Sequence, residues 1–117
     1  MLGMVRNTRS ISWIKAARKA FEAFPQGVQV EGAQALTVIA EGEMPDVAKP
    51  LKDLGAGVME LALRHRGDAF RVVFAVQLGA EVWVVHAFQK KAKAGIATPR
   101  TEIEVVRERL KPIREGL

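Results

Sequence analysis

Hydrophobic residues change their spacing along the chain, from a helical repeat near the N-terminus to alternation in the centre. Residues 16–24 repeat their apolar side chains at helical spacing, and Pro25 ends this predicted helix. Residues 26–41 contain no proline, and their composition favours a second helix. A short β-branched segment, residues 11–15, predicts a first strand. We therefore expect a strand followed by a helical hairpin.

The centre of the chain alternates apolar and polar positions, which is typical of half-buried strands. This alternation covers residues 58–65, 69–78 and 81–89. The links Arg66-Gly67 and Gly79-Ala80 suit two-residue hairpin turns. The pattern therefore predicts a three-stranded antiparallel meander.

Two further segments complete the predicted order. Residues 42–57 contain two prolines and three glycines, which predicts a connecting loop. Apolar residues recur at helical spacing in 103–113, and Thr98-Pro99 offers a cap and a first-turn proline for this last helix. The predicted fold class is α+β in the order β-α-α-β-β-β-α, as a single domain over residues 1–117. An antiparallel sheet would pack on the N-terminal helical hairpin.

The hairpin register predicts which side chains share a face of the meander. With two-residue turns, Arg64 opposes Ala69 and Arg71 opposes Phe88, and opposed residues lie on the same face. One face is then partly polar and partly exposed, and the other forms the core beneath the helices. The polar face collects Glu60, Arg64, Arg71, His86, Phe88 and Lys90, together with Val73, Val82 and Val84. The core face collects Met59, Leu61, Leu63, Phe70, Val72, Phe74, Val76, Trp83 and Val85.

Charge and composition narrow the classes of function. The net charge is +5, and residues 61–117 hold 11 basic and 6 acidic residues. Such an excess is typical of a chain that binds a polyanion, although it also fits a solvated surface without a ligand. The absence of cysteine excludes disulfides and cysteine zinc sites. With no membrane-length apolar segment and no secretory leader, we expect a cytoplasmic protein that does not associate with membranes.

The predicted polar face carries residue types suited to a phosphodiester. Arg64 and Arg71 can bind phosphate oxygens through planar guanidinium groups and stabilise charge in a transition state. His86 can transfer a proton near neutral pH, and Phe88 can stack on a base. Each has a structural alternative, since Arg71 could pair with Glu60 and His86 could simply be a strand histidine. With two histidines and no acidic cluster at ligand spacing, we expect neither a metal nor another cofactor.

Several segments resemble the phage-derived, HigB-type branch of the RelE/ParE toxin superfamily. They are GVMEL at 57–61, FRVVF at 70–74 and, most specifically, HAFQKKAKAGIATP at 86–99. The resemblance implies a RelE-like fold and the toxin of a type II toxin–antitoxin system. It further implies an endoribonuclease, or mRNA interferase, that cuts mRNA in the ribosomal A site without a metal. The 2′-hydroxyl would attack the adjacent phosphate.

The same resemblance implies roles for individual residues. Arg64 and Arg71 match phosphate-binding positions, Lys90 matches a basic catalytic position, and His86 lies where a proton-transfer group would be useful. RelE-type toxins often use a tyrosine, which this chain lacks, so His86 is the expected general base and a lysine is the alternative. The implied partners are mRNA on the ribosome and an antitoxin with a helix-turn-helix domain, through which operator DNA is bound. The implied RNA-binding residues are Lys49, Lys52, Phe88, Lys91 and Lys93.

Two other functions share this fold class and stay open at this point. ParE-type relatives block DNA gyrase and cut no RNA. A third reading is an inactive toxin that serves only as an antitoxin-binding module.

Overall fold

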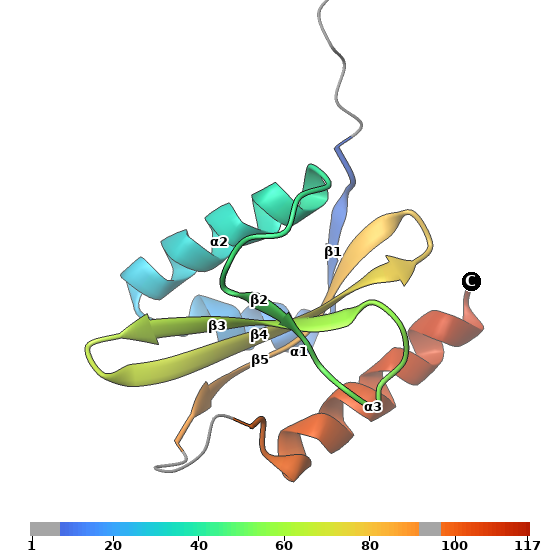
Figure 1. Ribbon diagram of the computed structural model, residues 1–117. Helices are drawn as coiled ribbons and strands as arrows, with labels where there is room; N and C mark the ends of the chain where they lie inside the picture. Colours follow the sequence, from blue (N-terminus) through green and yellow to red (C-terminus); the bar gives the residue numbers. More distant parts are fainter. Residues whose placement is uncertain (1–7, 92–96) are drawn as a thin grey trace, which may run out of the picture.

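The computed structural model describes residues 8–91 and 97–117, which form a five-stranded sheet with helices on both faces (Figure 1). The α+β class is as predicted, and the strand order across the sheet is β1-β5-β4-β3-β2. In chain order the elements are β1 (Ile11–Trp13), α1 (Lys15–Glu22), α2 (Gln26–Ala40), β2 (Ala48–Pro50), β3 (Val58–His65), β4 (Asp68–Leu78), β5 (Glu81–Lys90) and α3 (Arg100–Glu115).

The predicted meander is formed by β3, β4 and β5. Both hairpin turns contain two residues, since His65 pairs with Asp68 and Leu78 pairs with Glu81. In the first turn Arg66 and Gly67 adopt φ angles of 52° and 86°. A type I′ turn needs positive φ at both central positions, and its twist suits the flanking strands.

Two features of the sheet differ from the prediction. Residues 42–57 are not only a loop, because β2 lies within them and pairs antiparallel with β3. A three-residue strand that ends in proline is too short to show alternation in the sequence. The sheet is mixed rather than antiparallel, because β1 runs parallel to β5.

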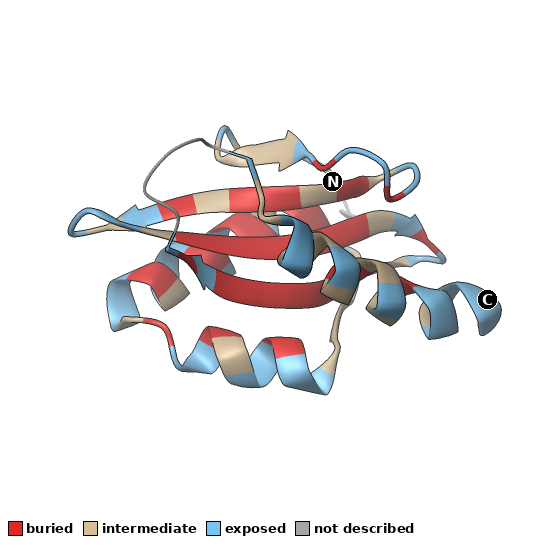
Figure 2. Cartoon of the chain, turned by 90° about the horizontal axis from the view of Figure 1, so that it is seen from below, coloured by how far each residue is buried: buried red, intermediate tan, exposed pale blue. Residues whose placement is uncertain are grey.

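The sheet has a hydrophobic core on each face. The helices α1 and α2 cover one face, where Phe21, Leu36 and Phe74 are buried. The helix α3 covers the other, where Val73, Val106 and Leu110 are buried. Figure 2 shows the central strands as the most buried part of the chain and the helices exposed on their outward sides. The second face is therefore not partly exposed as expected, because α3 packs on it.

A β-bulge interrupts the alternation of β5. Val73 pairs with His86, whereas the next residue, Phe74, pairs with Val84. Val85 is therefore an extra residue in β5, and such a residue leaves the ladder of hydrogen bonds and bends the strand.

The bulge reverses which face the first half of β5 presents. Val82 and Val84 pack in the core beneath α1 and α2. Trp83 and Val85 pack on the α3 side, so their assignment to the first core was wrong. A second irregularity lies between Ala75 and Leu78 and offsets the bulge by one residue. Val73 therefore still pairs with His86, as expected. Residues from His86 onward therefore keep the predicted face.

Candidate functional site

Three cross-strand rows gather the predicted site residues on the α3 side of the sheet. The register confirms that Arg64, Arg71, His86, Phe88 and Lys90 share this face, since directly paired residues point the same way. Lys49 of β2 joins them through its pairing with Glu60. The rows are Lys49–Glu60–Val73–His86, then Ala62–Arg71–Phe88, then Arg64–Ala69–Lys90.

Charged side chains are buried together on this face. In residues 8–91 and 97–117, the buried polar side chains are Glu60, Arg71, His86 and Lys90. Arg71 Nε lies 3.4 Å from Glu60 Oε1, with side chains 5% and 4% exposed. The ion pair left open as an alternative from the sequence is therefore present.

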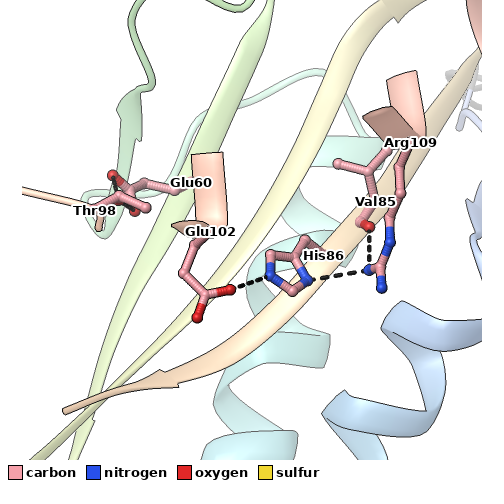
Figure 3. A network of polar contacts seen from close by, with 6 residues as sticks. All are labelled: Glu60, Val85, His86, Thr98, Glu102 and Arg109. Carbon is pink, nitrogen blue, oxygen red and sulfur yellow. Dashed lines mark hydrogen bonds and ion pairs between the residues drawn. The ribbon is translucent and has the colours of Figure 1, made fainter. Parts of the chain in front are cut away.

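Glu60 also links the sheet to the segment before α3. The Thr98 hydroxyl donates to Glu60 Oε1 at 2.7 Å and lies 3.0 Å from Oε2, and Figure 3 shows the two side chains in contact. Thr98 was predicted to cap the last helix, but α3 begins at Arg100 after Pro99 and has no side-chain cap. The hydroxyl instead stabilises a buried carboxylate.

Arg71 keeps one unused donor in this cluster. Its Nη1 donates to the Phe70 carbonyl at 3.3 Å. Its Nε is buried and donates no hydrogen bond within the described part of the chain, although Glu60 Oε1 lies 3.4 Å away. A buried donor without an acceptor is rare in native structures. The guanidinium is thus a fixed positive charge beneath the surface.

Lys90 is the fourth group of the buried cluster. Burial, and then the positive charges of Arg71 and Lys49, lower the pKa of Lys90 from its ordinary value, while Glu60 opposes this shift. A lowered pKa brings a lysine closer to proton exchange at neutral pH. The cluster therefore combines an excess of positive charge with a lysine whose pKa is lowered.

An open groove leads to this cluster from the side of β2. It has a volume of about 500 Å³, and its lining includes Lys49, Lys52 and Thr98. Lys52 is exposed and Lys49 is half-buried. Glu60 lies among the lining residues, so the groove connects solvent with the buried charges.

His86 is fixed by contacts with α3 at both ring nitrogens (Figure 3). Its Nε2 lies 2.6 Å from Glu102 Oε1, and its Nδ1 lies 3.1 Å from Arg109 Nη1. The same Arg109 nitrogen donates to the Val85 carbonyl at 2.9 Å, at the bulge. Because arginine only donates, Nδ1 accepts and Nε2 carries the proton, which is the neutral form of the ring.

The charge state of His86 agrees with this geometry. Burial lowers its pKa from the ordinary value of 6.5, and the Arg109 charge adds to the shift, whereas Glu102 opposes it. Phe88 stacks on the imidazole with ring centroids 5.1 Å apart and is buried. Neither ring faces solvent as a free proton donor or stacking platform.

The remaining predicted residues lie at the rim or outside the described part. Arg64 and Lys91 are exposed near the end of the meander. Lys93 lies outside the described residues. In the part of the chain that the structure describes, no group of three or more His, Cys, Asp or Glu side chains could hold a metal. No helix there is long and apolar enough to cross a membrane.

The sequence analysis did not identify three residues, in α3 or just before it, that contact the buried side chains of this face. They are Thr98, Glu102 and Arg109. Glu102 and Arg109 are seven residues apart, a spacing that places them on the same side of a helix. That signal was present, but nothing in the sequence shows that this side meets His86.

The fold and the cluster together define a small α+β protein with buried positive charge on one face of its sheet. Residues 19–111 match the family model described as phage derived protein Gp49-like (DUF891). The chain therefore belongs to the Gp49-like family of phage-derived proteins.

Solved structures contain a related fold. A chain in the crystal structure of the toxin–antitoxin complex RelBE2 from Mycobacterium tuberculosis matches with a TM-score of 0.51 and 16% identity. The match covers 73% of this chain and 94% of that chain. At this identity the likeness shows a shared fold, in agreement with the RelE-like architecture that the sequence implied. A search of curated proteins finds no match.

Proposed function

We propose that this chain is the toxin of a type II toxin–antitoxin system and an endoribonuclease that cleaves mRNA on the ribosome without a metal. The observation that carries the proposal is the cluster on the α3 side of the sheet. Arg71 and Lys90 are buried beside Lys49 and Arg64, with Glu60 as the paired carboxylate. Excess positive charge of this kind suits a phosphodiester backbone. Family membership and the shared fold support the toxin class.

The chemistry follows from these positions. Arg64 and Arg71 stabilise the charge on the scissile phosphate. Lys90 accepts the proton of the 2′-hydroxyl, whose oxygen attacks the adjacent phosphorus. The bond to the 5′-oxygen breaks, which leaves a 2′,3′-cyclic phosphate and a 5′-hydroxyl that takes up a proton.

The contacts of His86 favour Lys90 over His86 as the base. Both nitrogens of His86 are engaged by α3, so this ring can exchange a proton only after those contacts break. We assign His86 the role of holding β5, which carries Lys90, against α3. Lys49, Lys52, Lys91 and Lys93 are the proposed RNA contacts, and Phe88 would stack on a base only after leaving His86.

The proposed partners follow from the toxin class. A helix-turn-helix antitoxin would bind the chain and would carry the contact with operator DNA. The HigB-type branch and a cytoplasmic location belong to the same proposal.

Programmed ribosomes provide the test, with the 5′ ends of the mRNA mapped by primer extension. We expect cuts at A-site codons that fall about 100-fold with Arg64→Ala or Lys90→Met. Lys111→Met is the matched control, because Lys111 is exposed on α3 and pairs with Glu108 of the same helix. Arg71→Lys is preferred to Arg71→Ala, which would leave Glu60 buried without its counter-charge.

A charged groove without a clear acid and base would fit a second candidate, a gyrase-directed toxin that cuts no RNA, and the engagement of both His86 nitrogens removes one such group. Intact mRNA and normal translation at saturating protein would overturn the nuclease proposal. A supercoiling assay with gyrase would then separate the gyrase-directed toxin from an inactive antitoxin-binding module.

A further inference from the structure

The turn between β3 and β4 carries a residue that its geometry does not favour. Arg66 and Gly67 are the central residues of this type I′ turn, with φ angles of 52° and 86°. Asparagine, aspartate and glycine are the usual residues at such positions, because they adopt the left-handed conformation at little cost. An arginine at the first position therefore makes the turn less stable than an asparagine would.

The other positive φ angles of the described residues belong to residue types that tolerate them. Five belong to glycines, and one of 69° belongs to Asp53. The turn between β4 and β5 has a glycine, Gly79, at its first central position. Arg66 is thus an exception within the described part of the chain. Residues held in an unfavoured conformation are often found at functional positions.

The side chain of Arg66 has no structural partner. Both central residues of the turn are exposed, and Figure 1 and Figure 2 show this hairpin extending past the helices at one end of the sheet. Within residues 8–91 and 97–117, the Arg66 side chain makes no hydrogen bond or ion pair. The exposed Arg18, by contrast, is paired with Glu22 in its own helix. A contact within the fold therefore does not explain the arginine in the turn.

The turn continues a series of cations that begins at the buried cluster. Ala69 pairs with both Arg64 and Lys90 in the last cross-strand row, and Arg64 is exposed. Two residues of chain span at most about 7 Å, so the Cα atom of Arg66 lies within that distance of the Cα atom of Arg64. Lys91, which is also exposed, follows Lys90 directly. Exposed positive charge therefore leads from the cluster to the outer end of the hairpin.

Acidic residues do not cancel this charge. Residues 61–80 contain three arginines and one acid, Asp68. Asp68 is exposed and forms no ion pair within the described residues. The outer end of the hairpin therefore keeps a net positive charge.

We propose that the β3–β4 turn is a second contact point for RNA, at which Arg66 binds a phosphate of the strand that leaves the buried cluster. A guanidinium can donate to two phosphate oxygens at once. Because Arg66 is unpaired and stands on a projecting turn, it can do so without breaking a contact of the fold. This inference rests on the proposed function, since it extends the path of the same RNA beyond the scissile phosphate.

An acidic segment of a partner protein would also be attracted to this turn. The arrangement favours RNA, because the exposed cations continue from the proposed phosphate site and a nucleic acid carries one negative charge on every nucleotide. An acidic peptide would have to hold several carboxylates in the same sequence of positions. The two occupants are separated by measuring both with the same variants.

The test measures binding of the full chain to a fluorescent 2′-O-methyl RNA of about 10 nucleotides, which lacks the attacking hydroxyl and is not cut. We expect Arg66→Asn to weaken binding about threefold to fivefold at low salt. The slope of log K against log salt should become shallower by about 0.7, the value for one phosphate contact of a single strand. Arg66→Lys, which keeps the charge, should keep the slope. Lys19→Gln is the matched control, because it removes an exposed charge from α1 on the opposite face, and it should change neither quantity.

The same variant separates a lost contact from a damaged fold. Asparagine suits the first position of the turn, so Arg66→Asn should raise the melting temperature by about 2–5 °C while RNA binding weakens. A contact made only for the fold would show the reverse, with a lower melting temperature.

Three results would overturn the inference. The salt slope of Arg66→Asn could equal that of wild type, or its melting temperature could fall. Arg66→Asn could also lose affinity for a polyglutamate peptide of equal charge and keep its affinity for RNA, which would assign the turn to an acidic protein segment. The nuclease proposal is decided separately. Uncut mRNA on programmed ribosomes, with the change in salt slope still present, would remove the nuclease and leave the RNA contact at Arg66.

Discussion

Arg71 Nε lies 3.4 Å from Glu60 Oε1 in a part of the sheet that solvent hardly reaches. Two opposite charges buried together cost desolvation energy, and each depends on the other for compensation. Thr98 adds a hydrogen bond to the carboxylate, so the start of α3 is fixed to the same pair. The pair therefore joins the architecture of the fold to the charge of the proposed site.

Removing Glu60 should destabilise the protein far more than removing an exposed acid. Glu60→Ala leaves Arg71 buried without a counter-charge, and we expect a loss of about 3–5 kcal/mol in the free energy of unfolding. Glu22→Ala, which breaks the exposed pair with Arg18 at 3.2 Å, should cost less than about 1 kcal/mol. Urea denaturation of both variants measures the difference. Equal losses would show that the buried pair contributes no more to the free energy of unfolding than the exposed pair.

Replacing Lys90 should separate stability from activity. The lowered pKa of Lys90 means that its charged form is less favourable in the folded chain than in the unfolded chain. Lys90→Met removes the cost of keeping this charge in the folded chain. We therefore expect the melting temperature at pH 7 to rise while mRNA cleavage falls. The unfolded chain binds more protons between the lowered pKa and the ordinary value of 10.5, so wild-type stability should rise with pH in that window. A melting temperature below wild type would contradict this account.

The strands and turns were predictable because their signals are local. The two-residue turn at Arg66-Gly67 and the alternation of β3 and β4 determine the register that places Arg64 and Arg71 together. The bulge at Val85 was not predictable, because apolar residues occupy both faces of β5 and either alternation fits. The strand β2 was too short to show a pattern.

The shared face of the candidate residues was predictable, but their contacts were not. Arg64, Arg71, His86 and Lys90 share one face, as the register implied. That His86 is held at both nitrogens depends on how α3 crosses the sheet, and this long-range packing leaves no signature in spacing. The partners Glu102 and Arg109 therefore emerged only from the structure.

The neutral state of His86 predicts a pH dependence of stability. Its folded-state pKa lies below the ordinary 6.5, so near that pH the unfolded chain takes up a proton that the folded chain does not. Stability should therefore fall as the pH drops through about 6.5, until the lowered pKa is reached. His86→Gln should reduce this fall, and His65→Gln at the end of β3 is the control. Unfolding curves between pH 8 and 5 that are parallel for wild type and His86→Gln would be inconsistent with a neutral buried ring.

Close packing of α2 against α1 explains one of its glycines. A Cβ atom at Gly32 would lie 2.7 Å from Cε1 of Phe21, which is closer than side chains approach. The Phe21 ring is itself confined by Trp13 and Phe24, with ring centroids 5.2 Å and 5.7 Å away. It therefore has little room to move aside.

Two glycines in the same helix should respond oppositely to alanine. Gly32→Ala forces an atom into the aromatic cluster at a cost of up to about 3 kcal/mol, and at a contact of 2.7 Å we expect this cost to exceed the roughly 1 kcal/mol that alanine gains in a helix. Gly27→Ala meets only His65, at an ordinary 3.4 Å, and should stabilise the fold by about 0.5–1 kcal/mol. Urea denaturation of the two variants, with their helix content checked by circular dichroism, compares the effects. If Gly32→Ala proved as stable as Gly27→Ala, α2 could not lie as close to Phe21 as the structure places it.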